Sequence, residues 1–266
     1  MAETFDLSLE QAHAYEDLFV PALFAQWVPT LLRHAALSRG QHVLDVACGT
    51  GVVARAAAGL VGPSGRVAGV DLNPAMIQVA SEHAEDVDWR VADAAALPFD
   101  DQTFDAVMCQ SALFFFPEPS TALMEVARVL KSSGAVALQT YAGLEHQPGY
   151  GPFVDVVVRH ASENARELLG TYWSMGDIAE LRSLLTSVGI EPTTDERVLG
   201  HVTFPSVDAL VHTEIQATPL ADRITEHNYV ALIHDARNAL APYLEPGGAL
   251  RLPIRAQFVS GRKRPR

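Results

Sequence analysis

An apolar strand that runs directly into two closely spaced glycines constrains this chain more than any other feature. Residues 43–51 read VLDVACGTG, and a helix-forming segment follows from Val52 to Leu60. Glycines are needed where the backbone bends tightly and a ligand approaches without a side chain between. The N-terminus of the following helix directs free N–H groups at a polar group above it. The pattern predicts a buried strand, a turn that binds a nucleotide-like cofactor, and a helix.

A carboxylate at the end of the next strand indicates a cofactor that contains adenosine. The apolar segment 65–71 ends at Asp71, where a carboxylate can accept hydrogen bonds from both ribose hydroxyls. NAD and S-adenosylmethionine both carry this ribose. A dinucleotide fingerprint has the pattern Gly-x-Gly-x-x-Gly, but here no third glycine follows Gly49 and Gly51. An acid, Asp45, also stands inside the motif, so the glycine pattern favours S-adenosylmethionine.

At this point the chain resembles the class I S-adenosylmethionine-dependent methyltransferases, of the ubiquinone/menaquinone-methyltransferase-like, small-molecule type. The family's motifs recur in its order at residues 45–51, 70–76, 91–99 and 104–110. In the second of these, Asn73 is expected as a helix N-cap with Pro74 at the first helical position. A helix and turn that lead to a fifth strand follow at 126–134. The likeness is close over about residues 40–142 and looser over the rest.

The resemblance implies S-adenosyl-L-methionine as cofactor, S-adenosyl-L-homocysteine as product, and a set of cofactor-binding residues. Tyr15 would close over the cofactor, Asp45 would take its amino group, and Asp71 would hold the ribose. The remaining assignments are the methionine end for Ala47, Gly49 and Gly51, the adenine for Leu72, Met76, Asp93 and Ala94, and the vicinity of the methyl group for Gln110. The implied reaction is methyl transfer to an O or C atom of a small, apolar or aromatic metabolite.

The alternation of strands and helices predicts an α/β fold with a Rossmann-like, doubly wound, seven-stranded sheet. The sheet should be mostly parallel with an antiparallel last strand, and a helical lid and insertion should be added to it. We expect strands near 42–47, 66–71, 88–93, 104–110, 134–141, 195–204 and 250–260. We expect one domain over 1–266, composed of an N-terminal helical cap (1–40), a cofactor-binding core (41–142), a lid (143–175) and a C-terminal part (176–266) with a helical insertion at about 206–244.

No nucleophile motif is visible, which suits a reaction in which the cofactor carries the activation. A base is expected, because the acceptor must lose a proton around the time of transfer. The candidates are His146, which follows the fifth strand, and His212 and Glu214 in the insertion. Cys48 lies in the glycine turn, where we interpret it as a small residue rather than a nucleophile. We assign no metal site.

The charge and hydropathy of the chain restrict its partners to small molecules. A net charge of −13 opposes binding of a polyanion over a broad face, and the basic residues at 262–266 are typical of a solvated tail. No signal peptide and no apolar run of membrane-spanning length is found. We therefore expect a cytoplasmic protein that binds neither nucleic acid nor membrane, as a monomer or a homodimer.

Two other functions remain open at this point. A protein of this fold could bind the cofactor without transferring a methyl group and use it in a rearrangement or in regulation. An NAD-dependent oxidoreductase is the third possibility, disfavoured by the glycine pattern and by Asp45.

Overall fold

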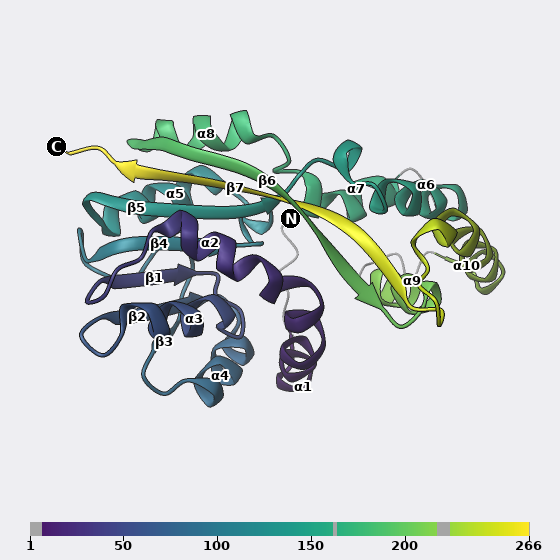
Figure 1. Ribbon diagram of the computed structural model, residues 1–266, viewed down its shortest axis with the longest axis horizontal. Coiled ribbons are helices and arrows are strands. Elements are labelled where there is room, and N and C mark those ends of the chain that lie inside the picture. Colours follow the sequence, from purple (N-terminus) through teal and green to yellow (C-terminus); the bar gives the residue numbers. More distant parts are fainter. Residues whose placement is uncertain (1–6, 162–163, 217–223, 266) are drawn as a thin grey trace. The chain divides into compact units, whose positions relative to one another are not determined.

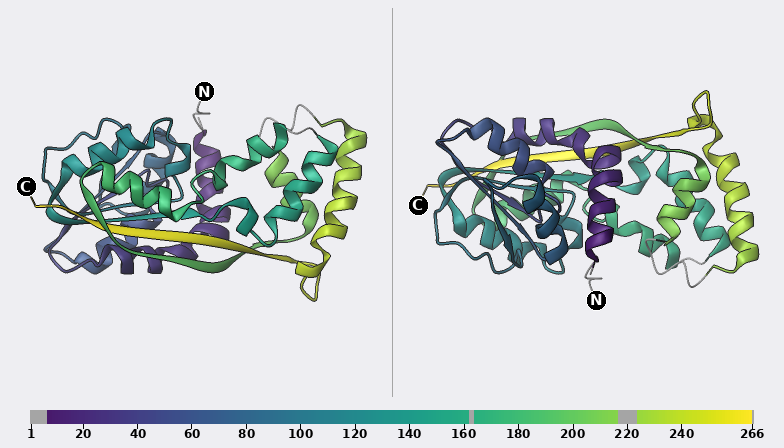
Figure 2. Two further views of the ribbon diagram at one scale, coloured as in Figure 1. Left: turned by 90° about the horizontal axis from the view of Figure 1, so that it is seen from above. Right: turned by 90° about the horizontal axis from the view of Figure 1, so that it is seen from below.

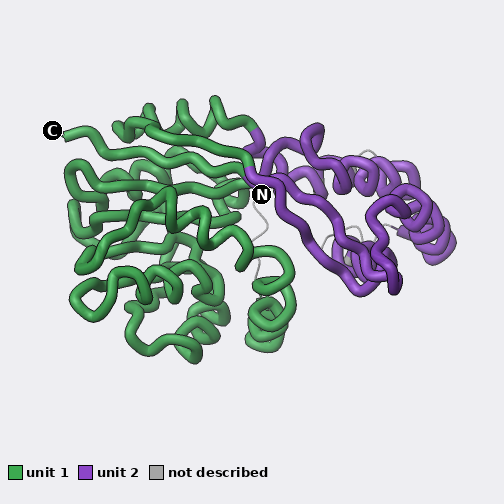
Figure 3. The backbone as a smooth tube through the Cα atoms, viewed as in Figure 1, with its two compact units in different colours: residues 1–140, 177–197, 257–266 green, residues 141–176, 198–256 purple. Residues whose placement is uncertain are grey.

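The computed structural model describes residues 7–161, 164–216 and 224–265. The chain divides into two compact units (Figure 3). Unit 1 comprises Met1–Thr140, Asp177–Arg197 and Gln257–Arg266, and unit 2 comprises Tyr141–Gly176 and Val198–Ala256. The sequence-based assignment of a single domain stays a prediction, and each unit is described by itself.

A seven-stranded sheet is the framework of unit 1, and its order is β3-β2-β1-β4-β5-β7-β6 (Figure 1). Parallel pairing joins β1 to β2 and β4, β2 to β3, and β4 to β5. Strand β7 runs antiparallel to β1, as Figure 1 shows. The expected mixed sheet with an antiparallel last strand is therefore confirmed. The strands are β1 His42–Val46, β2 Arg66–Asp71, β3 Asp88–Val91, β4 Phe104–Gln110, β5 Leu130–Tyr141, β6 Ile190–Phe204 and β7 Leu250–Lys263.

The central strands are apolar because helices cover both faces of the sheet. In β1 the side chains of Val43, Leu44 and Val46 are fully buried, as expected for a parallel strand buried on both sides. Helices α2 and α3 contact one another, as do α5 and α8, and Figure 2 shows these two pairs on opposite faces. Strand order reverses between β1 and β4, which is where ligands bind in sheets of this kind.

Helices α3 and α4 of unit 1 begin where the sequence places them. In α4 the side chain of Asn73 accepts from the N–H groups of Ala75 and Met76, and Pro74 is the first helical residue, which confirms the expected cap. The helices that cover unit 1 are α2 Val28–Ala35, α3 Val52–Val61, α4 Pro74–His83, α5 Pro119–Val129 and α8 Ile178–Ser187, with the short η3 Leu113–Phe115 after β4.

The N-terminal segment is helical, and its two prolines, Pro21 and Pro29, predict from the sequence that it consists of at least two pieces. It consists of α1 Leu9–Ala14, the π-helix η1 Tyr15–Phe24, and the 3-10 turn η2 Ala25–Trp27, which leads into α2. Pro29 lies in the first turn of α2, which agrees with a new helix beginning there. Pro21, by contrast, lies inside η1 and does not divide the segment. A proline removes one N–H donor and crowds the preceding turn, and the wider turn of a π-helix accommodates both effects.

Two strands begin earlier than the sequence indicates. Strand β5 starts at Leu130 and not at residue 134, because the chain adopts an extended conformation directly after α5. The strand includes Ser133, which has a left-handed φ of 65°. Strand β6 starts at Ile190, directly after Gly189 reverses the chain with a φ of 81°.

Unit 2 is largely helical and includes residues of the segments predicted as a lid (143–175) and an insertion (about 206–244); both roles stay predictions. Helix α10 packs against α6 and α9, and α6 contacts α7. Its helical elements are η4 Leu144–His146, α6 Tyr150–His160, α7 Asn164–Gly170, η5 Thr171–Trp173, α9 Val207–Gln216, α10 Glu226–Leu240 and η6 Ala241–Tyr243. Residues 217–223 of the insertion lie outside the described residues.

Candidate functional site

Strands β1 and β4 are neighbours at the point where the strand order reverses. Each is followed by a residue with a left-handed backbone conformation. After β1, Ala47 has a φ of 55°, and after β4, Ser111 has a φ of 53°. Such a conformation costs about 1–3 kcal/mol for a residue with a side chain and clusters at functional sites. Gly49 and Gly51 are also left-handed, with φ values of 54° and 89°. The chain therefore turns sharply outward at both strand ends, and Ser111 was not identified from the sequence.

The two glycines of the turn have different neighbours. A Cβ on Gly49 would meet only the ring and hydroxyl of Tyr15 at 3.7 Å, which is ordinary contact. A Cβ on Gly51 would lie 2.3 Å from the indole of Trp89. The absence of a side chain at Gly51 thus accommodates Trp89, and the role of both glycines in binding the cofactor stays a prediction. Tyr15 is thus a neighbour of Gly49, and its closure over the cofactor stays a prediction.

Asp45 carries a buried oxygen that lacks a partner. Its Oδ2 accepts from the N–H of Ala54 at 3.1 Å, whereas its Oδ1 has no hydrogen-bond partner among the described residues. The side chain is 1% exposed, and burial raises the pKa of Asp45 to about 8. A buried acceptor without a partner is costly and calls for a donor.

Gln110 at the end of β4 presents a second acceptor of this kind. Its Nε2 donates to the carbonyl of Phe24 at 2.9 Å, and its Oε1 is buried without a hydrogen-bond partner in the described part of the chain. Asp45 and Gln110 lie on the adjacent strands β1 and β4. The switch point of the sheet therefore offers two unsatisfied acceptors to a ligand that carries donors such as an ammonium group.

Asp71 closes the glycine turn from β2. Its Oδ2 accepts from the N–H of Gly49 at 2.8 Å, and its Oδ1 accepts from the N–H of Asn73 at 2.9 Å. Burial raises the pKa of Asp71, while these two N–H groups oppose the rise. A carboxylate has about four acceptor positions, so each oxygen can still accept from a ligand hydroxyl.

The residues expected beside the adenine have unequal exposure. Leu72 follows Asp71 and is 54% exposed, which leaves an apolar surface next to that carboxylate. Met76 is buried and packs with Ala12 and Val79 in the contact between α1 and α4. Met76 is therefore part of the core, and its contact with a ligand stays a prediction.

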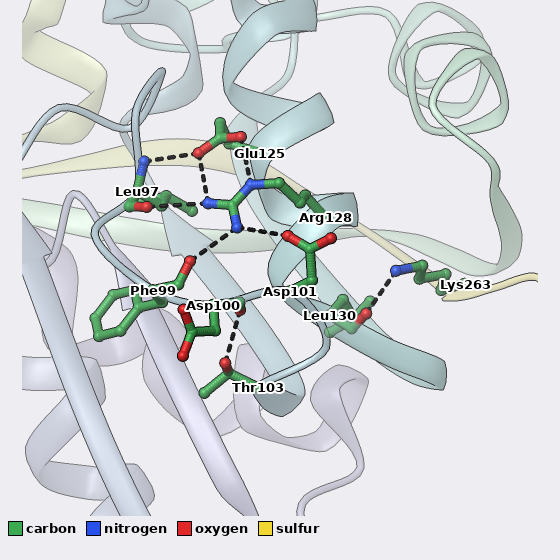
Figure 4. A network of polar contacts seen from close by, with 9 residues as sticks. All are labelled: Leu97, Phe99, Asp100, Asp101, Thr103, Glu125, Arg128, Leu130 and Lys263. Carbon is green, nitrogen blue, oxygen red and sulfur yellow. Dashed lines mark hydrogen bonds and ion pairs between the residues drawn. The ribbon is translucent and has the colours of Figure 1, made fainter.

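The acidic segment after β3 is tied to α5 by an arginine that the sequence reasoning missed. Asp93 is exposed, and its Oδ1 accepts from the N–H of Ala95 at 2.8 Å; Ala94 between them is half-buried. Farther along, Arg128 donates to the carbonyls of Leu97 and Phe99 at 3.0 and 2.8 Å (Figure 4). The only signal for this network was the three-residue spacing of Glu125 and Arg128 on a predicted helix.

Glu16, also absent from the sequence-based set, joins the N-terminal π-helix to the glycine turn. Its Oε2 accepts from the hydroxyl of Thr50 at 2.5 Å, and its Oε1 accepts from Arg55 at 2.6 Å. Arg55 also donates to the carbonyl of Thr50. Thr50 stands between the two glycines, so this contact reaches the centre of the turn.

Cys48 is a structural residue of the turn. Its thiol is buried and unoxidised, and burial raises its pKa well above the usual value. A nucleophilic cysteine needs a lowered pKa and access to substrate. The interpretation of Cys48 as a small turn residue is consistent with both observations.

The three candidate bases lie in unit 2 and differ in their surroundings. His146 in η4 is exposed, with Glu145 at 3.5 Å, and His212 on α9 is also exposed. Glu214 on α9 is half-buried, and its Oε1 accepts from the hydroxyl of Tyr150 at 3.3 Å. Burial raises the pKa of Glu214 to about 7. His212 and Glu214 are two residues apart on one helix and so do not face the same side.

Comparison with known proteins gives a consistent classification of this site. Residues 44–138 match the family model described as a methyltransferase domain. Over 198 residues the chain is 29% identical to the "Ubiquinone/menaquinone biosynthesis C-methyltransferase UbiE" of Hahella chejuensis, covering 72% of this chain and 77% of that protein. The family-model match includes the strand ends and the glycine turn described above.

Solved structures share the fold over most of the chain. The YcgJ protein of Bacillus subtilis is 22% identical, with a TM-score of 0.61 over 91% of this chain and 99% of that one. The [4+2]-cyclase SpnF is 21% identical, with a TM-score of 0.58 over 91% and 82%. A fold of this kind therefore also occurs in a protein named for a cyclisation.

Proposed function

We propose that this chain is a class I S-adenosylmethionine-dependent methyltransferase and that it transfers a methyl group to a hydroxylated aromatic ring of a small molecule. The observation that carries the proposal is the pair of unsatisfied buried acceptors, Asp45 Oδ1 and Gln110 Oε1, at the switch point of the sheet. Both atoms suit a ligand with donors at its polar end.

The residues present fit S-adenosylmethionine. Asp45 would accept from its amino group, and the backbone from Ala47 to Gly51 would hold its methionine end. Asp71 would hold the ribose hydroxyls, because its oxygens keep acceptor positions beyond those used by Gly49 and Asn73. The exposed apolar surface of Leu72 would lie against the adenine. Asp93 and Ala94 would bind the edge of the adenine ring.

The cofactor supplies an activated methyl group on a sulfonium sulfur, so the protein's task is alignment and exclusion of water. The left-handed turns at Ala47 and Ser111 and the buried position of Gln110 are rigid features suited to alignment. Tyr15, which lies over Gly49, would shield the methionine end from solvent.

The acceptor class rests on the relatives and on the residues after β4. The relative from Hahella is named for C-methylation in ubiquinone and menaquinone biosynthesis, and another, from Synechococcus elongatus, is named a 2-phytyl-1,4-naphtoquinone methyltransferase. In this chain Phe115 and Phe116 follow Gln110 closely and are half-buried. Aromatic side chains near the end of β4 suit a planar, apolar acceptor. We therefore propose a hydroquinone-like or phenol-like ring.

Of the three candidate bases, Glu214 is the one whose surroundings within unit 2 suit a general base best. A phenol must lose its proton around the time of transfer, and a general base works best with a pKa near the operating pH. Glu214 has a pKa of about 7 and a hydrogen bond from Tyr150 that holds its carboxylate in place. His146 and His212 are exposed and have no comparable support among the described contacts.

No helix among the described residues is long and apolar enough to cross a membrane. We propose soluble, short-chain acceptors as the first to test.

The experiment is a transfer assay with S-adenosylmethionine labelled on its methyl group. The acceptor panel contains short-chain benzo- and naphthohydroquinones, a simple phenol, and aliphatic amines as the contrasting class. We expect labelled product with the hydroxylated rings and equal formation of S-adenosylhomocysteine. Transfer to amines alone would contradict the acceptor class. Cofactor binding without transfer to any ring would favour the non-transferring alternative.

A further inference from the structure

We propose that Glu16 is a positioning residue for cofactor binding, because it holds the ring of Tyr15 over the glycine turn. This inference rests on the proposed function, since it concerns the same cofactor. It goes beyond that function because nothing in the motifs of the chain assigns a role to Glu16, Thr50 or Arg55.

The contacts of Glu16 join the N-terminal segment to the middle of the turn. One carboxylate oxygen accepts from the hydroxyl of Thr50, and the other accepts from Arg55. The side chain of Thr50 is 1% exposed, and the side chains of Glu16 and Arg55 are 13% and 22% exposed. A charged pair so little exposed to solvent has a defined geometry, unlike most ion pairs at a surface. Among the described residues, His83 also faces Glu16, with its Nε2 4.0 Å from Glu16 Oε1.

Tyr15 directly precedes Glu16 in the π-helix. Contacts that hold Glu16 in place therefore also fix the backbone from which the side chain of Tyr15 extends. The ring stacks on Phe24 with centroids 5.3 Å apart and on Phe19 at 6.1 Å. The ring edge and hydroxyl then come within contact distance of Gly49. The π-helix is thus held at its first turn by Glu16, while aromatic stacking orients the ring.

The other end of the same helix is held by a cofactor-site residue as well. Gln110 donates from Nε2 to the carbonyl of Phe24, the last residue of η1. The π-helix therefore spans from the glycine turn to the end of β4. π-helical segments are rare and are frequently found at functional sites. A ligand in the turn would lie beneath a segment that is attached on both sides, and its escape would require one attachment to open.

The test uses Glu16→Gln, which keeps the size of the side chain but loses the charge that pairs with Arg55. The matched control is Asp17→Asn, which removes the adjacent and exposed carboxylate from the same helix. The probe is S-adenosylhomocysteine, with its Kd from calorimetric titration and its dissociation rate from stopped-flow displacement. We expect Glu16→Gln to raise the Kd about ten-fold, chiefly through faster dissociation. Asp17→Asn should leave both values within about two-fold.

A double-mutant cycle with Tyr15→Ala separates positioning from a general loss of stability. If Glu16 acts through the ring, Glu16→Gln has almost no further effect on the Kd once Tyr15→Ala is present. Thr50→Val, which removes the hydroxyl that Glu16 binds, should give the same direction of change as Glu16→Gln. Additive effects of Glu16→Gln and Tyr15→Ala would overturn the inference, as would a Kd for Glu16→Gln equal to that of Asp17→Asn.

Failure of the inference is distinguishable from failure of the proposed function. Wild-type protein that binds S-adenosylhomocysteine while Glu16→Gln binds it equally well contradicts only the role of Glu16. Folded wild-type protein that does not bind S-adenosylhomocysteine contradicts both.

Discussion

The indole of Trp89 lies where a side chain on Gly51 would stand. A Cβ at Gly51 would be 2.3 Å from this ring, and one at Gly69, which pairs with Trp89 in the sheet, would be 2.4 Å from it. The indole nitrogen donates to the carbonyl of Ala84 at 2.7 Å, which fixes the ring from its other side. The glycine turn is therefore supported from within unit 1 by an aromatic ring.

Gly51→Ala should destabilise the protein by roughly 3 kcal/mol. The alanine would be strained by the left-handed backbone at this position, and its Cβ would collide with the ring of Trp89. The measurement is the free energy of unfolding from denaturant titration. Gly59→Ala in helix α3 is the control, since a Cβ there meets nothing within 4 Å and alanine favours the helix by about 0.5–1 kcal/mol. Equal stability of the two variants would show that Trp89 and the backbone of residue 51 adapt freely.

The unsatisfied acceptor of Asp45 predicts a pH-dependent affinity for S-adenosylhomocysteine. The pKa of Asp45 is raised to about 8 by burial, so the carboxyl group is protonated below that pH in the ligand-free protein. An ammonium group that binds beside it favours the carboxylate, and binding then releases a proton. The Kd should fall as pH rises from about 6 to about 8, by at most ten-fold per pH unit. Calorimetry in buffers of different ionisation enthalpy measures the proton release, and Asp45→Asn should abolish it.

The same group should make the ligand-free protein less stable as pH rises. Its folded-state pKa lies above its unfolded value of 3.8, so the folded state binds the extra proton between these two values. The free energy of unfolding therefore falls with rising pH, by at most about 1.4 kcal/mol per pH unit from this one group. The difference between wild type and Asp45→Asn across that range isolates the effect. A difference that does not change with pH would contradict the buried, unpartnered state of Asp45.

Arg128 should control the order of the segment that follows the acidic motif. It donates to the carbonyls of Leu97 and Phe99, and its ion pair with Glu125 lowers the pKa of that carboxyl group. We expect Arg128→Lys to destabilise the protein by about 1–3 kcal/mol, because lysine cannot reproduce the planar set of donors. Amide hydrogen exchange of residues 97–101 should also become faster. Arg39→Lys, at an exposed position, is the control; exchange equally fast in both variants would contradict the role of Arg128.

Glu214 should set the acid side of the pH–rate profile if it removes the acceptor proton. Its pKa of about 7 means that the carboxylate form increases as pH rises through neutrality. The ratio kcat/KM should rise over the same range in the wild type and become nearly flat in Glu214→Gln, at a value lowered by about 100-fold. His212→Gln is the control on the same helix. A profile unchanged by Glu214→Gln would remove Glu214 as the base.

The sheet and the turn could be predicted because they depend on local patterns. Apolar runs, the glycines and Asp71 mark strand ends in the sequence itself, and parallel pairing then brings those ends to one edge. The left-handed Ser111 could not be read in this way, since nothing about a serine indicates positive φ. Pro21 was misleading because a π-helix, which has no simple sequence signature, accommodates it.

The residues that support the site were missed for a related reason. Glu16 and Thr50 are 34 residues apart, and Trp89 reaches Gly51 only through the register of β2 and β3. Such contacts arise from tertiary packing, which a periodicity or a motif does not contain. Residues that contact a ligand carry a chemical signature in the sequence, whereas residues that position them do not.

Calorimetric titration of S-adenosylhomocysteine and of NADH into the wild type and Asp71→Asn tests the central claim most directly. We expect micromolar binding of S-adenosylhomocysteine, none of NADH, and a loss of binding of at least about ten-fold in the variant, because the ribose hydroxyls lose a charged acceptor. Circular dichroism of each protein checks that the variant is folded. Folded wild-type protein that binds NADH instead, or neither compound, would contradict the assignment of the cofactor.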